Sequence, residues 1–337
     1  MFAGCPSDVL ETRWDSNFIA LGTMISVLSA FTGLTTATYA FTVLRRPELQ
    51  TWYSFYSVSA GISIGGGAIW VMHFVGMQAL IMTVPCTGQV VRHTFNIGLT
   101  FTSLVAACLI GGMCMRLVMP AGGTDATPGS PAASPYWRLP FKLRGHSLYL
   151  GKFKPARFAA ATVALVAGVC VMHNMGLIGM YGPYWTQYDP GIVFASAALA
   201  LVASSAGLFI VVQCAYVGSA WYSIVVRGVA ALVIGGAVNA VHYVGMTAAK
   251  YHYTGDPSDN LMHHFGPNVP LQALGVLMAA LLITVAQLLG THAHIAHLAH
   301  TVTMAAKVAP APTSAAATYA PLAASARAAV TLPTASA

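Results

Sequence analysis

Seven long stretches almost free of charge constrain the fold of this chain more than any other feature of its sequence. The 337 residues are 57% hydrophobic and only 7% charged, whereas an ordinary soluble domain carries roughly a quarter charged residues. Each stretch is long enough for a helix to cross a bilayer, which takes roughly 20 apolar residues. We predict spanning helices at residues 18–44, 54–82, 95–118, 158–180, 191–216, 224–249 and 269–290. The predicted fold class is therefore an all-α, polytopic membrane protein with seven transmembrane helices.

The distribution of basic residues predicts the orientation. With the N-terminus outside, the inner side receives Arg45, Arg46, Arg116, Arg138, Lys142, Arg144, Lys152, Lys154, Arg157, Arg227, Lys307 and Arg327. The outer side receives Arg13, Arg92 and Lys250. This bias follows the positive-inside rule, so we predict N-out and C-in, in the plasma membrane. Because the basic residues lie in short segments between apolar runs, the net charge of +7 does not indicate nucleic-acid binding.

The rest of the chain divides into a short N-terminus, a loop and a tail. Residues 1–17 contain acidic residues and no signal-peptide pattern, so the first span is expected to insert uncleaved into the membrane domain at 18–290. Residues 120–155 are rich in Gly, Pro and Ser and then basic, which predicts a flexible inner loop. Residues 291–337 predict a disordered cytoplasmic tail. No catalytic module is expected in these segments, so signalling output would require an unknown cytoplasmic partner.

A histidine motif recurs in the second, fourth and sixth predicted helices. It reads Met-His-Phe-Val-Gly-Met at 72–77, Met-His-Asn-Met-Gly-Leu at 172–177 and Val-His-Tyr-Val-Gly-Met at 241–246. Glycine stands three residues after the histidine each time, and small glycine-containing stretches precede it. Small residues let membrane helices approach closely. The sequence thus predicts three motif-bearing helix pairs plus a final helix, with the histidine-bearing faces brought together.

The motif histidines are the candidates for chemistry inside the membrane. No Asp or Glu falls in a predicted span, and His73, His173 and His242 are the ionisable groups well within the helices, at one depth toward the outer face. Such groups are costly to bury and are functional candidates. Imidazole and thioether together suit copper. The alternative is a hydrogen-bonded polar knot that ties the helices together.

Spacing selects among the methionines. Met77 and Met246 each follow a motif histidine by four residues, so each pair lies on one helix face. Leu177 occupies that position in the second copy, while Met72 and Met172 precede their histidines on other faces. Taken singly, each methionine is equally explained as a packing residue.

Other polar residues leave alternatives open. His93, His252, His263 and His264 are attributed to solvated outer loops. The inner cluster His292, His294, His297 and His300 fits either metal binding or an interfacial position. Cys5 and Cys86 both lie outside the spans, where a disulfide is permitted. The remaining four cysteines, Cys108, Cys114, Cys170 and Cys214, lie in spans and are expected to pack.

The three motifs resemble those of the MHYT family, named for a Met-His-Tyr-Thr run in a seven-helix membrane sensor domain. The resemblance covers residues 18–290. It implies copper bound through the motif His and Met residues and sensing of oxygen, carbon monoxide or nitric oxide, in a domain often fused to cyclic-di-GMP enzymes or a histidine kinase. The residues carried over are His73, His173 and His242 as ligands, with Met72, Met77, Met172 and Met246 as candidates. Threonine is absent from all three copies, and Leu177 and Val241 replace methionines.

The leading hypothesis is a membrane sensor that binds copper near the outer face and responds to a diatomic gas or to redox state. One rival is a copper transporter, although the spans show no ligand groups toward the inner side to continue a path. A second rival is a haem-binding redox protein that uses two histidines as axial ligands. A retinal receptor is disfavoured because the seventh span contains no lysine.

Overall fold

The computed structural model describes residues 8–44, 47–119, 137–143, 146–150, 155–216, 221–254 and 269–308. Seven helices in these ranges are long and apolar enough to cross a membrane, which confirms the predicted multi-pass membrane protein. The first is α1 (Ser16–Leu44). The later ones contain α4 (Ile97–Val118), α5 (Pro155–Ile178), α6 (Pro190–Tyr216), α7 (Trp221–Thr247) and α8 (Val269–Val308).

The second span is a composite of four helical segments. They are η1 (Pro47–Trp52), α2 (Tyr53–Ile62), η2 (Ser63–Val71) and α3 (Met72–Gln78). The η2 segment has π-helical hydrogen bonding, a rare form that is frequent at functional sites. A Cβ atom at Gly65 would collide with the Ala107 carbonyl of α4, while the Ser63 hydroxyl donates to the Ser29 carbonyl of α1 at 2.9 Å. Close packing on both sides therefore encloses the segment that immediately precedes the first motif.

Small hydroxyl residues let α1 contact several other helices. The Ser26 hydroxyl donates to the Ala68 carbonyl of η2 at 2.8 Å, and Thr23 donates to the Asn239 side chain of α7 at 3.0 Å. Many α1 side chains are Ser, Thr, Ala or Gly and are buried. Such residues permit close helix approach in a bilayer, where apolar burial cannot drive helices together.

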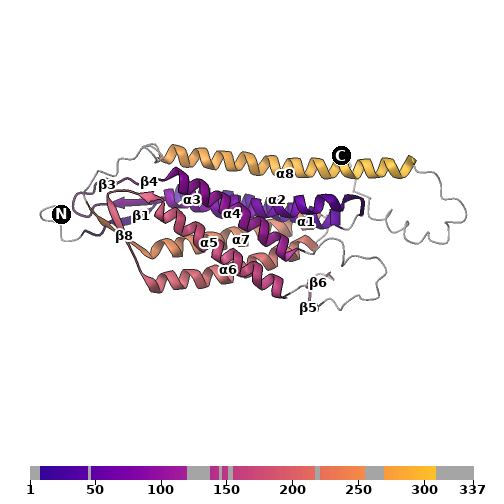
Figure 1. Cartoon of the computed structure of the whole chain (residues 1–337), viewed down its shortest axis with the longest axis horizontal. Coiled ribbons are helices and arrows are strands. Elements are labelled where there is room, and N and C mark those ends of the chain that lie inside the picture. Colours follow the sequence, from indigo (N-terminus) through magenta and orange to yellow (C-terminus); the bar gives the residue numbers. More distant parts are fainter. Residues whose placement is uncertain are drawn as a thin grey trace, which may run out of the picture. The chain divides into compact units, whose positions relative to one another are not determined.

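Short antiparallel strands follow the motif-bearing helices. Strand β2 (Leu80–Thr83) pairs with β1 (Glu11–Trp14) and β3 (Val90–Val91). Strand β4 (Thr94–Phe95) pairs with β7 (Met180–Tyr181), and β8 (Tyr184–Tyr188) pairs with β9 (Ala249–Tyr253). Figure 1 shows β1, β3, β4 and β8 at the same end of the helices. The described connections at this end therefore form a β cap.

The structure differs from the sequence prediction in several segments. The second span ends at Gln78 and not at residue 82, because the residues that follow pair as β2. Helix α8 continues past residue 290 to Val308, since the Ala-rich sequence there favours helix even without a core. Within the predicted flexible loop at 120–155, β5 (Trp137–Leu143) and β6 (His146–Leu150) form an antiparallel hairpin.

A large cluster of buried apolar residues lies toward the cap end of the helices. It includes Trp70, Phe74, Met77, Phe95 and Met246, drawn from spans and strands alike. In contrast, large apolar side chains such as Phe194 on α6 and Leu109 on α4 are exposed, as expected for surfaces that face lipid. Residues of all three motifs thus belong to this buried cluster.

Candidate metal centre

The three motif histidines lie at one depth because the three helix pairs are built alike. His73, His173 and His242 each stand five residues before the last residue of their helix, which is Gln78, Ile178 and Thr247 respectively. The residue after each helix end, which is Ala79, Gly179 or Ala248, is small and precedes a strand. Equal spacing from equivalent helix ends therefore sets the histidines in a single layer.

A repeated backbone hydrogen bond ties each helix pair together at this end. The carbonyls of Ala79, Gly179 and Ala248, just after the motif helices, each accept an N–H. The donors are Asp15, Asn96 and Asp189, each placed just before the first helix of its pair, at 2.8 Å in all three cases. The side chains of Asp15, Asn96 and Asp189 also accept N–H groups of the helix that follows them. These N-cap residues fix the start of one helix relative to the end of its partner.

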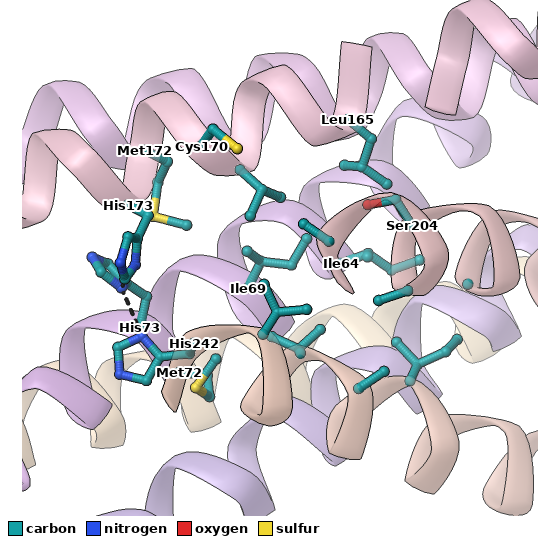
Figure 2. Close-up of a pocket in the computed structure, with 18 of the residues that line it drawn as sticks. Ile64, Ile69, Met72, His73, Leu165, Cys170, Met172, His173, Ser204 and His242 are labelled. Carbon is teal, nitrogen blue, oxygen red and sulfur yellow. Dashed lines mark hydrogen bonds between the residues drawn. The ribbon is translucent and has the colours of Figure 1, made fainter. Parts of the chain in front are cut away.

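The imidazoles of the three histidines converge, as the sequence predicts. His73 Nδ1 lies 3.0 Å from His242 Nδ1 and 3.2 Å from His173 Nδ1. One ring nitrogen from each histidine can be chosen so that all three lie within 4.8 Å of one another. Figure 2 shows the three rings side by side, each from a different helix. His73 and His242 are only 3% exposed, and His173 is partly buried.

Hydrogen bonding alone does not satisfy this cluster. An imidazole nitrogen carries either one hydrogen or one lone pair in the ring plane, so His73 Nδ1 can form a normal hydrogen bond with one of its two neighbours at a time. A cation between the rings would instead accept a lone pair from each. Metal–nitrogen bonds of about 2.0–2.1 Å at tetrahedral angles separate the nitrogens by roughly 3.3 Å. Two of the three separations, 3.0 and 3.2 Å, are close to that value, and the three nitrogens lie within 4.8 Å of one another. The donor set therefore suits a bound ion, which would draw the third imidazole closer.

Each motif glycine makes room for a histidine of another copy. A Cβ atom at Gly76 would overlap the His242 ring, and one at Gly176 would overlap the His73 ring. At Gly245 the Cβ atom would stand 3.1 Å from His173 Nε2, a looser fit. The contacts form a closed cycle through the three copies. Sequence reasoning assigned these glycines to helix approach in general and missed that each one accommodates an imidazole.

The methionines separate into two groups. Met72 and Met172 line the same cavity as the three histidines. Met77 and Met246, which the four-residue spacing favours as ligands, are buried in the surrounding core and do not line that cavity. All four remain candidates, but the structure brings Met72 and Met172 closer to the histidine layer than helix periodicity suggested.

Two other predicted histidines, His93 and His252, belong to the cap and not to this cluster. His93 is buried in the cap beside Phe95, and burial lowers its pKa to about 4. His252 stacks on Trp185 and pairs with Asp8 at 3.2 Å. His292, His294, His297 and His300 lie on α8. His263 and His264 are outside the described residues.

The cysteines fall into two groups as well. Cys86 is disulfide-bonded. Cys5, with which the sequence permits a disulfide, lies outside the described residues. Cys108, Cys114, Cys170 and Cys214 are free thiols. Among these, Cys114 and Cys170 line the cavity that reaches the histidines, a placement that their position in the sequence did not indicate.

Comparison with known proteins supports the resemblance to the MHYT family. The profile of the MHYT family, described as a bacterial signalling protein N-terminal repeat, matches residues 66–126 and 167–226. These segments contain the first and second motifs, while the third motif at 241–246 lies outside them. No solved structure matches the chain significantly.

Curated relatives are signalling proteins much longer than this chain. The chain is 26% identical over 243 residues to the bifunctional diguanylate cyclase/cyclic di-GMP phosphodiesterase MucR of Pseudomonas aeruginosa, covering 72% of this chain and 29% of the relative. It is 27% identical to the signaling protein YkoW of Bacillus subtilis, covering 57% and 19%. It is 23% identical to the cyclic di-GMP phosphodiesterase NbdA of Pseudomonas aeruginosa, covering 70% and 24%. The chain therefore spans less than a third of each.

Proposed function

Because this chain is a multi-pass membrane protein that carries the MHYT repeat of bacterial signalling proteins, we propose that it is a membrane sensor whose motif histidines hold a copper ion. The proposal rests on one observation, the convergence of three imidazoles from three helices, with His73 Nδ1 3.0 and 3.2 Å from the Nδ1 atoms of the other two. His73, His173 and His242 would be the ligands, with Met72 and Met172 as additional thioether donors from the cavity wall. Imidazole and thioether favour copper over magnesium or calcium.

A bound copper ion would supply redox chemistry and affinity for a diatomic gas such as oxygen, carbon monoxide or nitric oxide. The chain's own residues hold the imidazoles in place and exclude water from them, since His73 and His242 are almost fully buried. The helix arrangement can respond only if the occupied site favours one packing over another. With the N-terminus outside, the site would lie toward the outer face of the plasma membrane, and an unidentified cytoplasmic partner or module would receive the signal.

The geometry supports a single ion better than haem. Two axial nitrogens on opposite faces of a porphyrin are separated by about two metal–nitrogen bonds, or ~4 Å, with the macrocycle between them. Here His73 Nδ1 lies only 3.0 and 3.2 Å from the Nδ1 atoms of the other two histidines. The ring centroids are 4.8, 5.0 and 5.7 Å apart, so the rings contact one another directly. A haem plane would have to force these helices apart.

The experiment is copper analysis of the full chain purified in detergent. We expect one copper per chain in the wild type and a loss of copper in His73→Ala, His173→Ala and His242→Ala. Met24→Ala is a control, because Met24 on α1 is 54% exposed and does not line the cavity that contains the histidines. Unchanged copper content in all three histidine variants would refute the metal proposal.

A second candidate function, copper transport, is favoured by one observation. Cys170, Cys114 and Met115 line the same cavity as the histidines, so soft ligands are available along the cavity as well as at the motif layer. Vesicles that contain the purified protein distinguish the two functions. A sensor binds copper without transfer to the vesicle interior, whereas a transporter accumulates it there.

A further inference from the structure

A buried arginine lies toward the end of the helices opposite the histidine layer. Arg227 precedes His242 by 15 residues on α7, a distance of about 22 Å at a helical rise of 1.5 Å per residue. Its side chain is only 8% exposed. The 27 residues of α7 extend about 40 Å, the thickness of a bilayer with its head groups, and Arg227 lies about 9 Å from the start of this helix. The guanidinium is therefore near the boundary between lipid head groups and acyl chains.

The protein groups around Arg227 are polar but neutral. The Thr38 hydroxyl of α1 donates to the Cys214 carbonyl of α6 at 3.5 Å. The guanidinium is close enough to the Cys214 thiol and the Tyr39 hydroxyl to interact with both electrostatically. Ser223, one helical turn before Arg227 on α7, has an enclosed hydroxyl without a hydrogen-bond partner among the described residues. Because α1, α6 and α7 contain no Asp or Glu, none of these helices supplies a counter-charge.

The guanidinium itself makes no hydrogen bond or ion pair with the part of the chain that the structure describes. Its Nε is enclosed and has no partner there. The two terminal nitrogens also have no partner there, but they are not enclosed, so a group from outside the protein can reach them. An unpaired charge at this depth is costly. The planar fork of an arginine matches two oxygens of a phosphate, which makes a phosphate a suitable missing partner.

The surface beside Arg227 indicates the source of this phosphate. Ile224, Val225 and Val226 immediately before it and Val229 after it are all exposed, as expected for a surface that faces lipid. Phospholipid acyl chains would cover these side chains, whereas a soluble phosphate or a protein carboxylate would leave them uncovered. Because the three surrounding helices contain no carboxylate to bind an ammonium group, the site favours a head group with a net negative charge over a zwitterionic one.

From these features we propose that Arg227 binds the phosphate of an anionic phospholipid, such as phosphatidylglycerol, from the adjacent leaflet. The two terminal nitrogens donate to phosphate oxygens, and the acyl chains lie against the exposed apolar side chains of α7. The site is where α7 meets α1 and α6, because Arg227 interacts there with Tyr39 and Cys214. This inference goes beyond the proposed function and does not rest on the metal centre.

The test is native mass spectrometry of the full chain purified in detergent and titrated with phosphatidylglycerol, phosphatidylcholine or inorganic phosphate. We expect the wild type to retain phosphatidylglycerol saturably and to bind phosphatidylcholine roughly tenfold more weakly. Arg227→Gln should weaken phosphatidylglycerol binding by roughly tenfold or more, and Arg227→Lys, which keeps the charge but loses the planar fork, by less. Arg116→Gln is the matched control, because it removes one positive charge from an exposed side chain in the last turn of α4, at the same end of the helices.

Several results would overturn the proposal. If the wild type retained no phosphatidylglycerol, an acidic protein segment would be the better candidate for the partner of Arg227. Equal binding of the two lipids, or undiminished binding by Arg227→Gln, would exclude a specific phosphate contact at this residue. Equal losses in Arg227→Gln and Arg116→Gln would indicate a general effect of surface charge. Displacement of the lipid by inorganic phosphate would assign the site to a soluble anion. If Arg227→Gln fails to fold, Arg227→Lys carries the test, and binding equal to that of the wild type would then refute the proposal.

Discussion

At the scale of single residues, the candidate centre depends on space as much as on ligands. Three histidines supply the nitrogens, and three glycines at the same offset leave room for the neighbouring rings. The sequence predicted the histidines because buried ionisable groups are rare in spans. It could not predict the pairing of each glycine with a histidine of another copy, since that depends on which helices are neighbours.

Alanine at the motif glycines should disrupt the centre in a graded way. Gly76→Ala and Gly176→Ala would place a methyl group in an imidazole, so we expect loss of copper and destabilisation of about 1–3 kcal/mol from overpacking. Gly245→Ala, where the fit is looser, should have a smaller effect. Copper analysis and thermal unfolding in detergent measure both. Gly236→Ala, with no atom within 4 Å of the new methyl group, is the control; an equal effect there would contradict the explanation.

His93 predicts a pH dependence of stability in the cap. Burial lowers its pKa to about 4 from an unfolded value near 6.5, so the unfolded chain binds a proton in the interval where the folded chain does not. Its contribution to stability is fully present above pH 6.5 and is lost as the pH falls toward 4, by at most about 3 kcal/mol. The midpoint of thermal unfolding should fall over this interval in the wild type and fall less in His93→Phe. Parallel curves for the two proteins would refute this role.

At the scale of elements, one helix-pair plan is used three times. Each first helix begins after a capping residue whose backbone N–H binds the end of the paired motif helix. The apolar runs and the periodic motif predicted the pairs. The β cap was not predicted, because its strands are two to five residues long and their pairing joins segments distant in sequence, such as β1 with β2 and β8 with β9.

Removal of one N-cap should weaken the corresponding helix pair. The Asp189 carboxylate accepts N–H groups of Gly191 and Ile192 at 2.9 and 3.3 Å, at the start of α6. Asp189→Ala should therefore cost about 1 kcal/mol, whereas Asp189→Asn keeps the acceptor and should cost little. Thermal unfolding in detergent compares the two variants. If Asp189→Asn lost as much stability as Asp189→Ala, the charge of Asp189 and not its capping hydrogen bonds would be responsible.

At the scale of the whole molecule, the two ends of the membrane domain differ. The β cap and the histidine layer lie at one end, and basic residues including Arg116 and Arg157 lie toward the other, where Arg157 donates to the Arg116 carbonyl at 3.2 Å. The positive-inside rule predicts that the cap faces outward. This orientation remains a prediction.

Labelling in intact cells tests the orientation. Val90 in β3 is 55% exposed, and Arg157 at the start of α5 is partly exposed. A membrane-impermeant maleimide should label Val90→Cys in intact cells, and Arg157→Cys only after permeabilisation. The wild type, whose free thiols Cys108, Cys114, Cys170 and Cys214 lie in spans, gives the background. The reverse labelling pattern would invert the topology and place the histidine layer toward the cytoplasm.

The sequence by itself determined that this protein spans a membrane seven times and carries three histidines in one layer. Hydropathy and the repeated motif are local signals in the sequence. The equal distance from each histidine to the end of its helix sets the three histidines at one depth. The tertiary structure alone decided which methionines share a cavity with the histidines and which glycine meets which imidazole. Helices that are apolar on all sides carry little periodic signal for their rotation, so these choices depend on the lateral order and packing of the bundle.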